Sequence, residues 1–282
     1  MKAFVYGAKG SVGSDVVRFL TEKGVEVLGG TREPKEGEKR AGLQWVYADA
    51  KNPSKGTEVL KEVEAAFFLS PPGHMNQHEI LGPWLEAAKS YGLKKVVLMT
   101  AMGIEYAPPE TPFRKLELFL ESSGIPWNIL RPNWFMQNFQ TYWIGGILSQ
   151  NKIFFPGGDA KASFIDTRDI AKTAAALLTS DRQNNQAFTL TGPEALDHNQ
   201  IAKEISKVTG KNIEYVNISP EEFKKGLVSA GLSPEYSDML VYIAGVLREG
   251  QAALVNDAVK SITGSDAISF AKYASDNQSV WK

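Results

Sequence analysis

The stretch that decides the fold lies close to the N-terminus and reads Gly7-Ala8-Lys9-Gly10-Ser11-Val12-Gly13. It follows a short apolar run, residues 3–6, and leads into residues 12–20, where apolar side chains recur at helical spacing. Glycines three apart between a strand and a helix permit a tight turn and let a pyrophosphate approach the backbone and the first N–H groups of the helix. The stretch therefore predicts a dinucleotide-binding turn, and the alternative is an ordinary tight turn.

Short apolar runs separated by helical patterns continue through the first half of the chain. They occupy residues 25–30, 43–47, 65–69, 95–99 and 127–130, with a further candidate at 187–190. Strands without polar alternation are typical of a parallel sheet that is covered on both faces. We therefore predict an α/β fold with a Rossmann-type, doubly wound parallel sheet.

The pattern changes after about residue 133. Aromatic residues concentrate there, glycine pairs at 145–146 and 157–158 interrupt the alternation, and the chain is mainly helical from Pro193 onward. Asp197 is a suitable N-cap for a helix over residues 201–208. We expect a Rossmann domain over residues 1–135, with a contribution from about 164–192. A smaller, mainly helical C-terminal substrate lobe would comprise residues 136–163 and 193–282.

Composition excludes several classes of chemistry. The 282 residues include 31 Lys and Arg against 32 Asp and Glu, no cysteine and three histidines. Balanced charge without a basic run argues against nucleic-acid binding. The absence of cysteine removes thiolate and iron–sulfur chemistry, and we expect no metal site. No apolar stretch is long enough for a membrane span or a signal peptide, so we expect a cytoplasmic protein without a membrane partner.

The end of the second predicted strand indicates which dinucleotide binds. An NAD site has a carboxylate there, about 20 residues after the glycines, whereas this chain has Thr31 and Arg32, with Glu33 following. A guanidinium suits a 2′-phosphate and can lie over the adenine, and Lys9 adds a second cation. The pattern favours NADP(H), and the alternative is two solvated surface cations.

Several further segments resemble the NmrA-like family of atypical short-chain dehydrogenases/reductases. Besides the glycine stretch they are residues 70–72, 100–103, 123–139, 164–170 and 190–193. The resemblance implies an NADP-binding Rossmann domain and a small variable lobe, with the substrate cleft between them. Members include quinone and triphenylmethane-dye reductases, iminium-reducing enzymes, and redox-sensing regulators without turnover.

The resemblance also implies roles for individual residues. The pyrophosphate would contact Gly7, Gly10, Ser11, Val12 and Gly13, and the adenosine end would contact Thr31, Arg32, Asp49 and Ala50. The middle of the cofactor and its nicotinamide end would contact Leu69, Ser70, Pro71, Thr100 and Pro132. The substrate would be enclosed by His74, Met75, Met102, Trp134, Phe135, Phe139 and Phe164. For the aromatic residues the alternative is an ordinary core.

The chain departs from typical short-chain dehydrogenases in its proton donors. Tyr106 is followed four places later by Glu110, so the Tyr-x-x-x-Lys pair is absent. Phe113 stands where isoflavone-reductase-like relatives place a Lys. Lys115 is two places away, a rotation of about 200° on a helix, and is expected to be a solvated residue with Glu117 and Glu121 nearby. His74 is the one weak catalytic candidate, and otherwise it is an exposed residue at a helix start.

The absence of a Tyr–Lys proton donor narrows the range of expected substrates. A ketone becomes an alkoxide on reduction and needs an acid, whereas a quinone, a dye or an iminium compound accepts hydride without one. We therefore predict an NADP(H)-dependent oxidoreductase that transfers hydride to such a small planar acceptor, as a monomer or homodimer. The alternative is an NADP-binding, redox-sensing regulatory protein without turnover.

Overall fold

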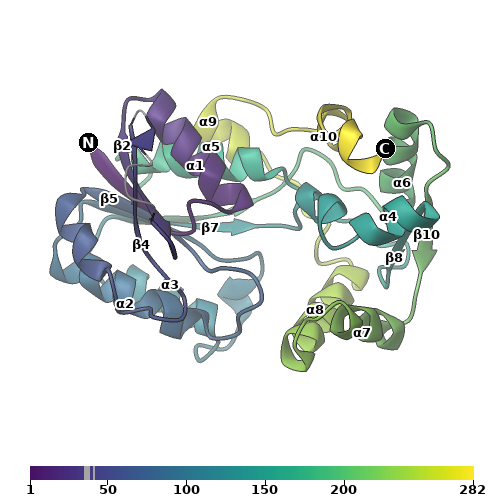
Figure 1. Ribbon diagram of the computed structural model, residues 1–282, viewed down its shortest axis with the longest axis horizontal. Helices are drawn as coiled ribbons and strands as arrows, with labels where there is room; N and C mark the ends of the chain where they lie inside the picture. Colours follow the sequence, from purple (N-terminus) through teal and green to yellow (C-terminus); the bar gives the residue numbers. More distant parts are fainter. Residues whose placement is uncertain (35–38, 41) are drawn as a thin grey trace. The chain divides into compact units, whose positions relative to one another are not determined.

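The computed structural model describes residues 1–34, 39–40 and 42–282. The chain divides into two compact units (Figure 1). Unit 1 comprises residues 1–132 and 167–190, and unit 2 comprises residues 133–166 and 191–282. The boundaries expected from the sequence, 135, 164 and 192, lie a few residues away. Asn133 illustrates the difference, because its side-chain amide donates hydrogen bonds to Ser163 Oγ at 2.7 Å and the Ala252 carbonyl at 2.8 Å, both in unit 2.

Unit 1 is built on a mainly parallel sheet whose strand order, within the described residues, is β3-β4-β2-β1-β5-β6-β7-β9. The strands are β1 (Lys2–Val5), β2 (Glu26–Thr31), β3 (Lys39–Arg40), β4 (Leu43–Tyr47), β5 (Ala65–Leu69), β6 (Lys95–Met99), β7 (Trp127–Pro132) and β9 (Gln186–Leu190). Every described pair is parallel except β3 with β4. The predicted Rossmann-type sheet is confirmed, including its candidate strand at 187–190.

Helices cover both faces of this sheet. One face carries α1 (Ser11–Glu22) and α5 (Thr167–Leu178), and the other carries α2 (Gln77–Ser90) and α3 (Pro112–Glu121) (Figure 1). On the second face, the Phe4 and Trp84 rings stack with centroids 4.9 Å apart and planes 3° from parallel. Burying apolar side chains on both faces explains why the strands are apolar without alternation.

Two short 3₁₀ helices complete unit 1, η1 (Thr57–Glu62) and η2 (Ile104–Tyr106). Between β4 and β5 the chain forms η1. Gly56, at its start, has φ +93°, and a Cβ at this position would lie 2.5 Å from the Tyr47 carbonyl oxygen. The chain therefore turns sharply at Gly56, just before η1.

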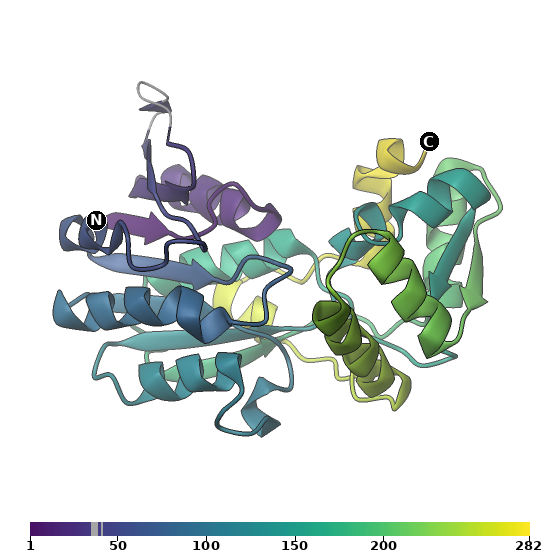
Figure 2. The same ribbon diagram turned by 60° about the horizontal axis from the view of Figure 1, so that its bottom comes forward.

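Unit 2 is mainly helical, as predicted. Its elements are η3 (Met136–Gln140), α4 (Ile144–Gln150), β8 (Lys152–Phe155), α6 (His198–Thr209), β10 (Glu214–Asn217), α7 (Pro220–Ser229), α8 (Pro234–Arg248), α9 (Ala258–Thr263), α10 (Phe270–Asp276) and η4 (Gln278–Trp281). Strands β8 and β10 form a parallel pair (Figure 2). None of the described helices is long and apolar enough to cross a membrane.

The predicted N-cap of α6 is confirmed. Asp197 accepts a hydrogen bond from the Gln200 N–H at 2.8 Å, and the Gln200 side chain accepts one from the Asp197 N–H at 3.0 Å. This reciprocal capping satisfies two N–H groups that a helix start otherwise leaves unpaired. The first residue of the helix, His198, is thereby directed into the aromatic core of unit 2, against Phe139, Phe155 and Phe164.

Candidate functional site

The carboxyl ends of the parallel strands bring most of the predicted cofactor residues to one edge of unit 1. Strand β1 lies between β2 and β5, so the chain builds the sheet outward from this point in both directions. The switch in direction leaves a crevice that doubly wound folds use for ligands. At or just beyond the carboxyl ends lie Gly7, Thr31, Arg32, Asp49, Ala50, Leu69, Ser70, Pro71, Thr100 and Pro132.

Each glycine of the loop between β1 and α1 has its own geometric reason. Gly7 has φ +68°, a conformation that disfavours side chains. A Cβ on Gly13 would lie 2.2 Å from the Gly7 carbonyl oxygen, so only glycine lets α1 pack this closely on the loop. Gly10 is exposed and is the N-cap of α1. Its lack of a side chain leaves the loop backbone open to a ligand.

The start of α1 suits an anion. No side chain caps it, and its first turn carries no acidic residue. The N–H groups of Ser11, Val12 and Gly13 thus point outward at the positive end of the helix dipole. Leu69, at the end of β5, lies against the same loop, since a Cβ on Gly7 would be 3.2 Å from its Cδ1. These residues fit the cradle that a pyrophosphate requires.

At the end of β2 the two predicted cations differ in their surroundings. Arg32 is exposed and forms no ion pair with any residue that the structure describes. Lys9 instead places its ammonium 4.7 Å from the centre of the Trp45 ring, on β4. The Ala48 N–H donates to the Thr31 carbonyl at 2.9 Å, which holds the ends of β2 and β4 together. Arg32 is therefore the cation that remains available to a phosphate.

Asp49 and Ala50 follow β4 and are half-buried. The Asp49 carboxylate accepts a hydrogen bond from the Lys51 N–H at 3.0 Å and forms a long contact of 3.5 Å with the Tyr47 hydroxyl. The carboxylate thus fixes the local turn, and its position beside Thr31 agrees with the adenosine end of the predicted site.

A buried ion-pair network supports the ends of β6 and β7. The Glu117 carboxylate, on α3, is 0% exposed. It accepts hydrogen bonds from Thr100 Oγ1 at 2.7 Å, from Arg131 Nε at 3.0 Å and Nη2 at 2.8 Å, and from Arg114 Nη1 at 2.8 Å. Burial alone would lower the pKa of Arg131, but the hydrogen bond and charge of Glu117 raise it above its ordinary value. The network therefore keeps its charges.

The sequence interpretation missed this role of Glu117. It placed Glu117 beside a solvated Lys115, whereas Lys115 is exposed and the partners of Glu117 are arginines and Thr100. A signal was present, because Glu117 shares a buried helical stripe with Leu120 and follows the buried Leu116. A carboxylate at a core position requires cationic or hydroxyl partners.

The network also holds together the residues predicted at the nicotinamide end. The Thr100 N–H donates to the Leu130 carbonyl at 2.9 Å, and the Met102 N–H donates to the Pro132 carbonyl at 3.1 Å. Thr100, Met102 and Pro132 therefore lie side by side. The Thr100 hydroxyl donates its hydrogen bond to Glu117. Toward any other group, the hydroxyl oxygen can therefore only accept a hydrogen bond.

His74 and Met75 occupy the turn before α2, also in unit 1. His74 is half-buried, and its carbonyl accepts a hydrogen bond from Gln77 Nε2 at 2.5 Å, while Met75 is exposed. Tyr106 is 87% exposed, with Glu110 four places later. In the part of the chain that the structure describes, no group of three or more His, Asp or Glu side chains could hold a metal ion.

Two of the predicted substrate residues lie in the interior of unit 2. Phe139 is 0% exposed and Phe164 is 2% exposed. Their rings pack edge to face at 5.4 Å, and both contact Phe270. Other rings cover both side chains, which fits the ordinary-core alternative, and their predicted contact with a substrate stays a prediction. Trp134 and Phe135 are half-buried, and their predicted role stays a prediction.

Comparison with known proteins gives one family and a consistent fold. Residues 2–253 match the NmrA-like family. An NAD(P)H azoreductase from Xenophilus azovorans is 30% identical, over 96% of this chain and 96% of its own length. The Prestalk A differentiation protein A of Dictyostelium discoideum is 28% identical, over 98% of this chain and 92% of its own length.

Among solved structures, an NADPH-dependent quinone oxidoreductase from Escherichia coli, complexed with NADPH, is similar with a TM-score of 0.85. It is 23% identical, and the match covers 98% of this chain and 99% of that one. At this identity the likeness concerns the fold.

Proposed function

Because this chain belongs to the NmrA-like family, we propose that it is an NADP(H)-dependent reductase of a small planar acceptor, such as a quinone, a dye or an iminium compound. The observation that carries the proposal is the glycine loop at the carboxyl end of β1, with the exposed Arg32 at the end of β2, which has no ion-pair partner among the described residues. The relatives named azoreductase and quinone oxidoreductase support the reaction class.

The residues of unit 1 fit the cofactor in order along the sheet edge. Gly7, Gly10, Ser11, Val12 and Gly13 hold the pyrophosphate, while Thr31, Arg32, Asp49 and Ala50 hold the adenosine end. Leu69, Ser70 and Pro71 contact the middle, and Thr100 and Pro132 the nicotinamide end. Lys9 contributes positive potential from its place over Trp45. When bound, the nicotinamide supplies the hydride.

Arg32 selects NADP(H) over NAD(H) in this proposal. Arg32 is exposed and has no ion-pair partner among the described residues. A 2′-phosphate could therefore bind its guanidinium without first breaking an ion pair with one of them. An NAD site has a carboxylate at this place, and its negative charge would repel a 2′-phosphate.

In the proposed reaction the protein positions the acceptor against the nicotinamide and does not supply a proton. Tyr106 is exposed with Glu110 in place of a lysine, and Lys115 faces solvent, which supports the absence of a Tyr–Lys relay. An acceptor that spreads charge or already carries it needs no such acid. His74, Met75 and Met102 of unit 1, with Trp134 and Phe135 of unit 2, remain the proposed substrate contacts, and His74 the weak proton-donor candidate.

The proposal is tested by following NADPH absorbance with 2-methyl-1,4-naphthoquinone, an azo dye and a cyclic iminium compound. We expect oxidation with at least one of them and a lower KM for NADPH than for NADH. Tight NADPH binding without turnover of any acceptor would overturn the reductase and favour the regulatory alternative.

Arg32→Ala tests the choice of cofactor. We expect the KM for NADPH to rise by about 10- to 100-fold, since a hydrogen bond to a charged group contributes about 1.5–3 kcal/mol, while the KM for NADH stays nearly constant. Lys23→Ala, at the opposite end of α1, is the matched control and leaves both values unchanged. Equal changes for the two cofactors would contradict the role of Arg32.

A further inference from the structure

The segments that leave β6 and β7 stay side by side beyond the regular ladder of the sheet. Met99 and Leu130 are the last register pair of the two strands. The Thr100 N–H then donates to the Leu130 carbonyl at 2.9 Å, and the Met102 N–H donates to the Pro132 carbonyl at 3.1 Å. Three residues of the proposed site, Thr100, Met102 and Pro132, therefore depend on how these two strand ends are held together.

Side-chain direction explains why Thr100 meets Glu117. Along β6, Val96 and Leu98 belong to the apolar core that also contains Leu116 of α3. Because side chains alternate between the two faces of a strand, Thr100 projects to the same face as Val96 and Leu98. It therefore reaches Glu117, the residue after Leu116, and donates a hydrogen bond to Oε1 at 2.7 Å.

Glu117 uses both carboxylate oxygens to connect the two strand ends. Oε1 also accepts a hydrogen bond from Arg131 Nε at 3.0 Å, and Oε2 accepts from Arg131 Nη2 and Arg114 Nη1, each at 2.8 Å. With the Thr100 hydroxyl these donors occupy the lone-pair sites of the carboxylate, and Glu117 is 0% exposed. Glu117 can therefore act on a cofactor only through the residues that it holds.

Arg131 extends this connection to η2. Its Nη1 lies 3.6 Å from Oε1 of Glu105, which belongs to η2. The segment 100–105 is thus held to β7 near both of its ends, by Thr100 through Glu117 and by Glu105 through Arg131. Without the Glu117 carboxylate, Thr100 would lose its acceptor, and Arg131 would keep only its longer contact with Glu105 among the described residues.

We propose that Glu117 is a positioning residue, which holds the ends of β6 and β7 together so that Thr100, Met102 and Pro132 meet the nicotinamide end of the cofactor in a fixed arrangement. The proposal rests on the proposed function and adds a residue that touches neither cofactor nor substrate. The adenosine end is assigned to β2, β4 and the loop after β1, and β5 separates these strands from β6. Loss of Glu117 should therefore weaken contacts at the nicotinamide end alone.

The test compares NADP⁺ with adenosine 2′,5′-bisphosphate, which keeps the adenosine and its 2′-phosphate but lacks the nicotinamide and its ribose. For Glu117→Gln we expect calorimetry to show a rise of about 3- to 10-fold in the Kd of NADP⁺, the equivalent of about one hydrogen bond, and a change below about 2-fold for the bisphosphate. With 2-methyl-1,4-naphthoquinone at saturating NADPH, kcat should fall by about 10- to 100-fold, because the hydride donor is held less precisely.

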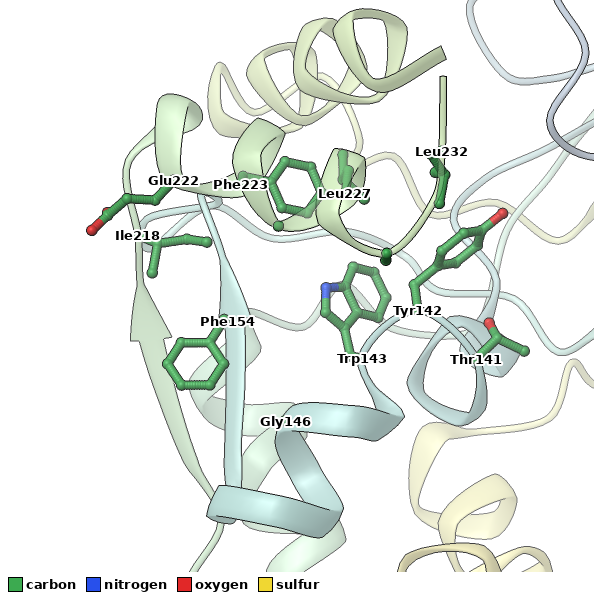
Figure 3. A pocket seen from close by; sticks show the side chains of 12 residues that line it. Thr141, Tyr142, Trp143, Gly146, Phe154, Ile218, Glu222, Phe223, Leu227 and Leu232 are labelled. Carbon is green, nitrogen blue, oxygen red and sulfur yellow. The ribbon is translucent and has the colours of Figure 1, made fainter. Parts of the chain in front are cut away.

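Two controls separate positioning from stability. Arg114→Gln removes a partner of Glu117 that lies on α3 itself, so the bonds from Glu117 to Thr100 and Arg131 remain. Phe223→Leu enlarges a cavity whose lining residues all belong to unit 2 (Figure 3). Both changes lower stability, and we expect both variants to bind NADP⁺ as the wild type does.

If circular dichroism shows that Glu117→Gln is unfolded, Glu117→Asp takes its place. It keeps a negative charge beside the arginines and withdraws the carboxylate from Thr100 by one methylene, so the same selective rise in the Kd of NADP⁺ is expected. Adding Thr100→Val to either variant should cause no further rise, because the two residues act through one bond.

The role of Glu117 is overturned if its folded variants bind NADP⁺ as tightly as the wild type, or if binding of the two ligands weakens equally. It is also overturned if Arg114→Gln weakens NADP⁺ binding as much as the Glu117 variants do. Absence of turnover with every acceptor would overturn the reductase alone, since the binding comparison still decides the role of Glu117. Failure of the wild-type chain to bind NADP⁺ would overturn both proposals.

Discussion

Two buried ionisable side chains, Glu117 in unit 1 and His198 in unit 2, lie in opposite kinds of environment. In unit 1, Glu117 is enclosed by two guanidinium groups and the hydroxyl of Thr100. In unit 2, both ring nitrogens of His198 are buried, and neither has a hydrogen-bond partner among the residues that the structure describes. The imidazole is stacked between Phe155 at 4.6 Å and Tyr215 at 5.1 Å.

The difference lies in which protonation state each environment stabilises. Carboxylate partners stabilise the ionised arginines of the Glu117 network, and the pKa values of Arg114 and Arg131 are raised by their hydrogen bonds with carboxylates despite burial. Aromatic rings surround His198, and burial among them lowers its pKa to about 3. Unit 1 thus holds charge beneath the proposed nicotinamide end, while the aromatic rings of unit 2 favour the neutral form of His198.

The largest effect is expected from Glu117→Gln, which removes the charge at the centre of the network. Arg131, only 11% exposed, would lose its bidentate partner. We expect the free energy of unfolding to fall by about 3–5 kcal/mol, as when one member of a buried pair is removed. Urea unfolding followed by circular dichroism measures this change.

Glu121→Gln is the matched control for that variant. Glu121 lies on the same helix and binds the same Arg114, but is 30% exposed. We expect a loss of no more than about 1 kcal/mol, because solvent screens an exposed pair. Equal losses in the two variants would show that burial of Glu117 does not set its contribution.

A smaller effect is expected from pH acting on His198. Its folded-state pKa lies near 3 and its unfolded value near 6.5, so its stabilising contribution is complete above about pH 6.5 and is lost as the pH falls toward 3. The loss is about 1.4 kcal/mol per pH unit in this interval, or about 2 kcal/mol between pH 6.5 and 5. Unfolding at a series of pH values measures the slope.

His198→Phe removes the titrating group and keeps a ring in the stack, so the slope below pH 6.5 should decrease by about that amount. Phe270→Leu, in the same aromatic core, lowers stability by leaving a cavity but should retain the wild-type slope. If the slopes of wild type and His198→Phe coincide, the neutral histidine is not the cause.

The smallest effect is expected from Thr100→Val, which preserves shape and removes one hydrogen bond to Glu117. Three guanidinium bonds remain on the carboxylate, so the free energy of unfolding should fall by only about 1 kcal/mol. Because Thr100 also lies at the proposed nicotinamide end, the KM for NADPH should rise. A loss as large as that of Glu117→Gln would mean that the hydroxyl, not the arginines, stabilises the buried charge.

The sequence predicted the fold of unit 1 well because its signals are local. Apolar runs without alternation are typical of buried strands of a covered parallel sheet, and each was found within a residue or two of its predicted place. The capping of α6 by Asp197 is equally local, since both partners lie within one helical turn.

The candidate site was predicted less completely. The glycine loop is a contiguous motif, so its geometry could be inferred. The partners of Glu117 come from β6, β7 and α3, and no sequence spacing connects Thr100 with Arg131 through a carboxylate. Likewise, the sequence could not distinguish an aromatic wall from an aromatic core, and Phe139 and Phe164 proved to be core.

The sequence by itself therefore determined the order of strands and helices, the glycine turn before α1 and the cationic residue after β2. These follow from backbone stereochemistry and from periodicity, which act over a few residues. Packing between distant segments decided that Glu117 is buried and paired with two arginines, and that His198 is neutral and stacked. Burial and desolvation act through neighbours in space, and the positions of those neighbours are set only when the whole chain has folded.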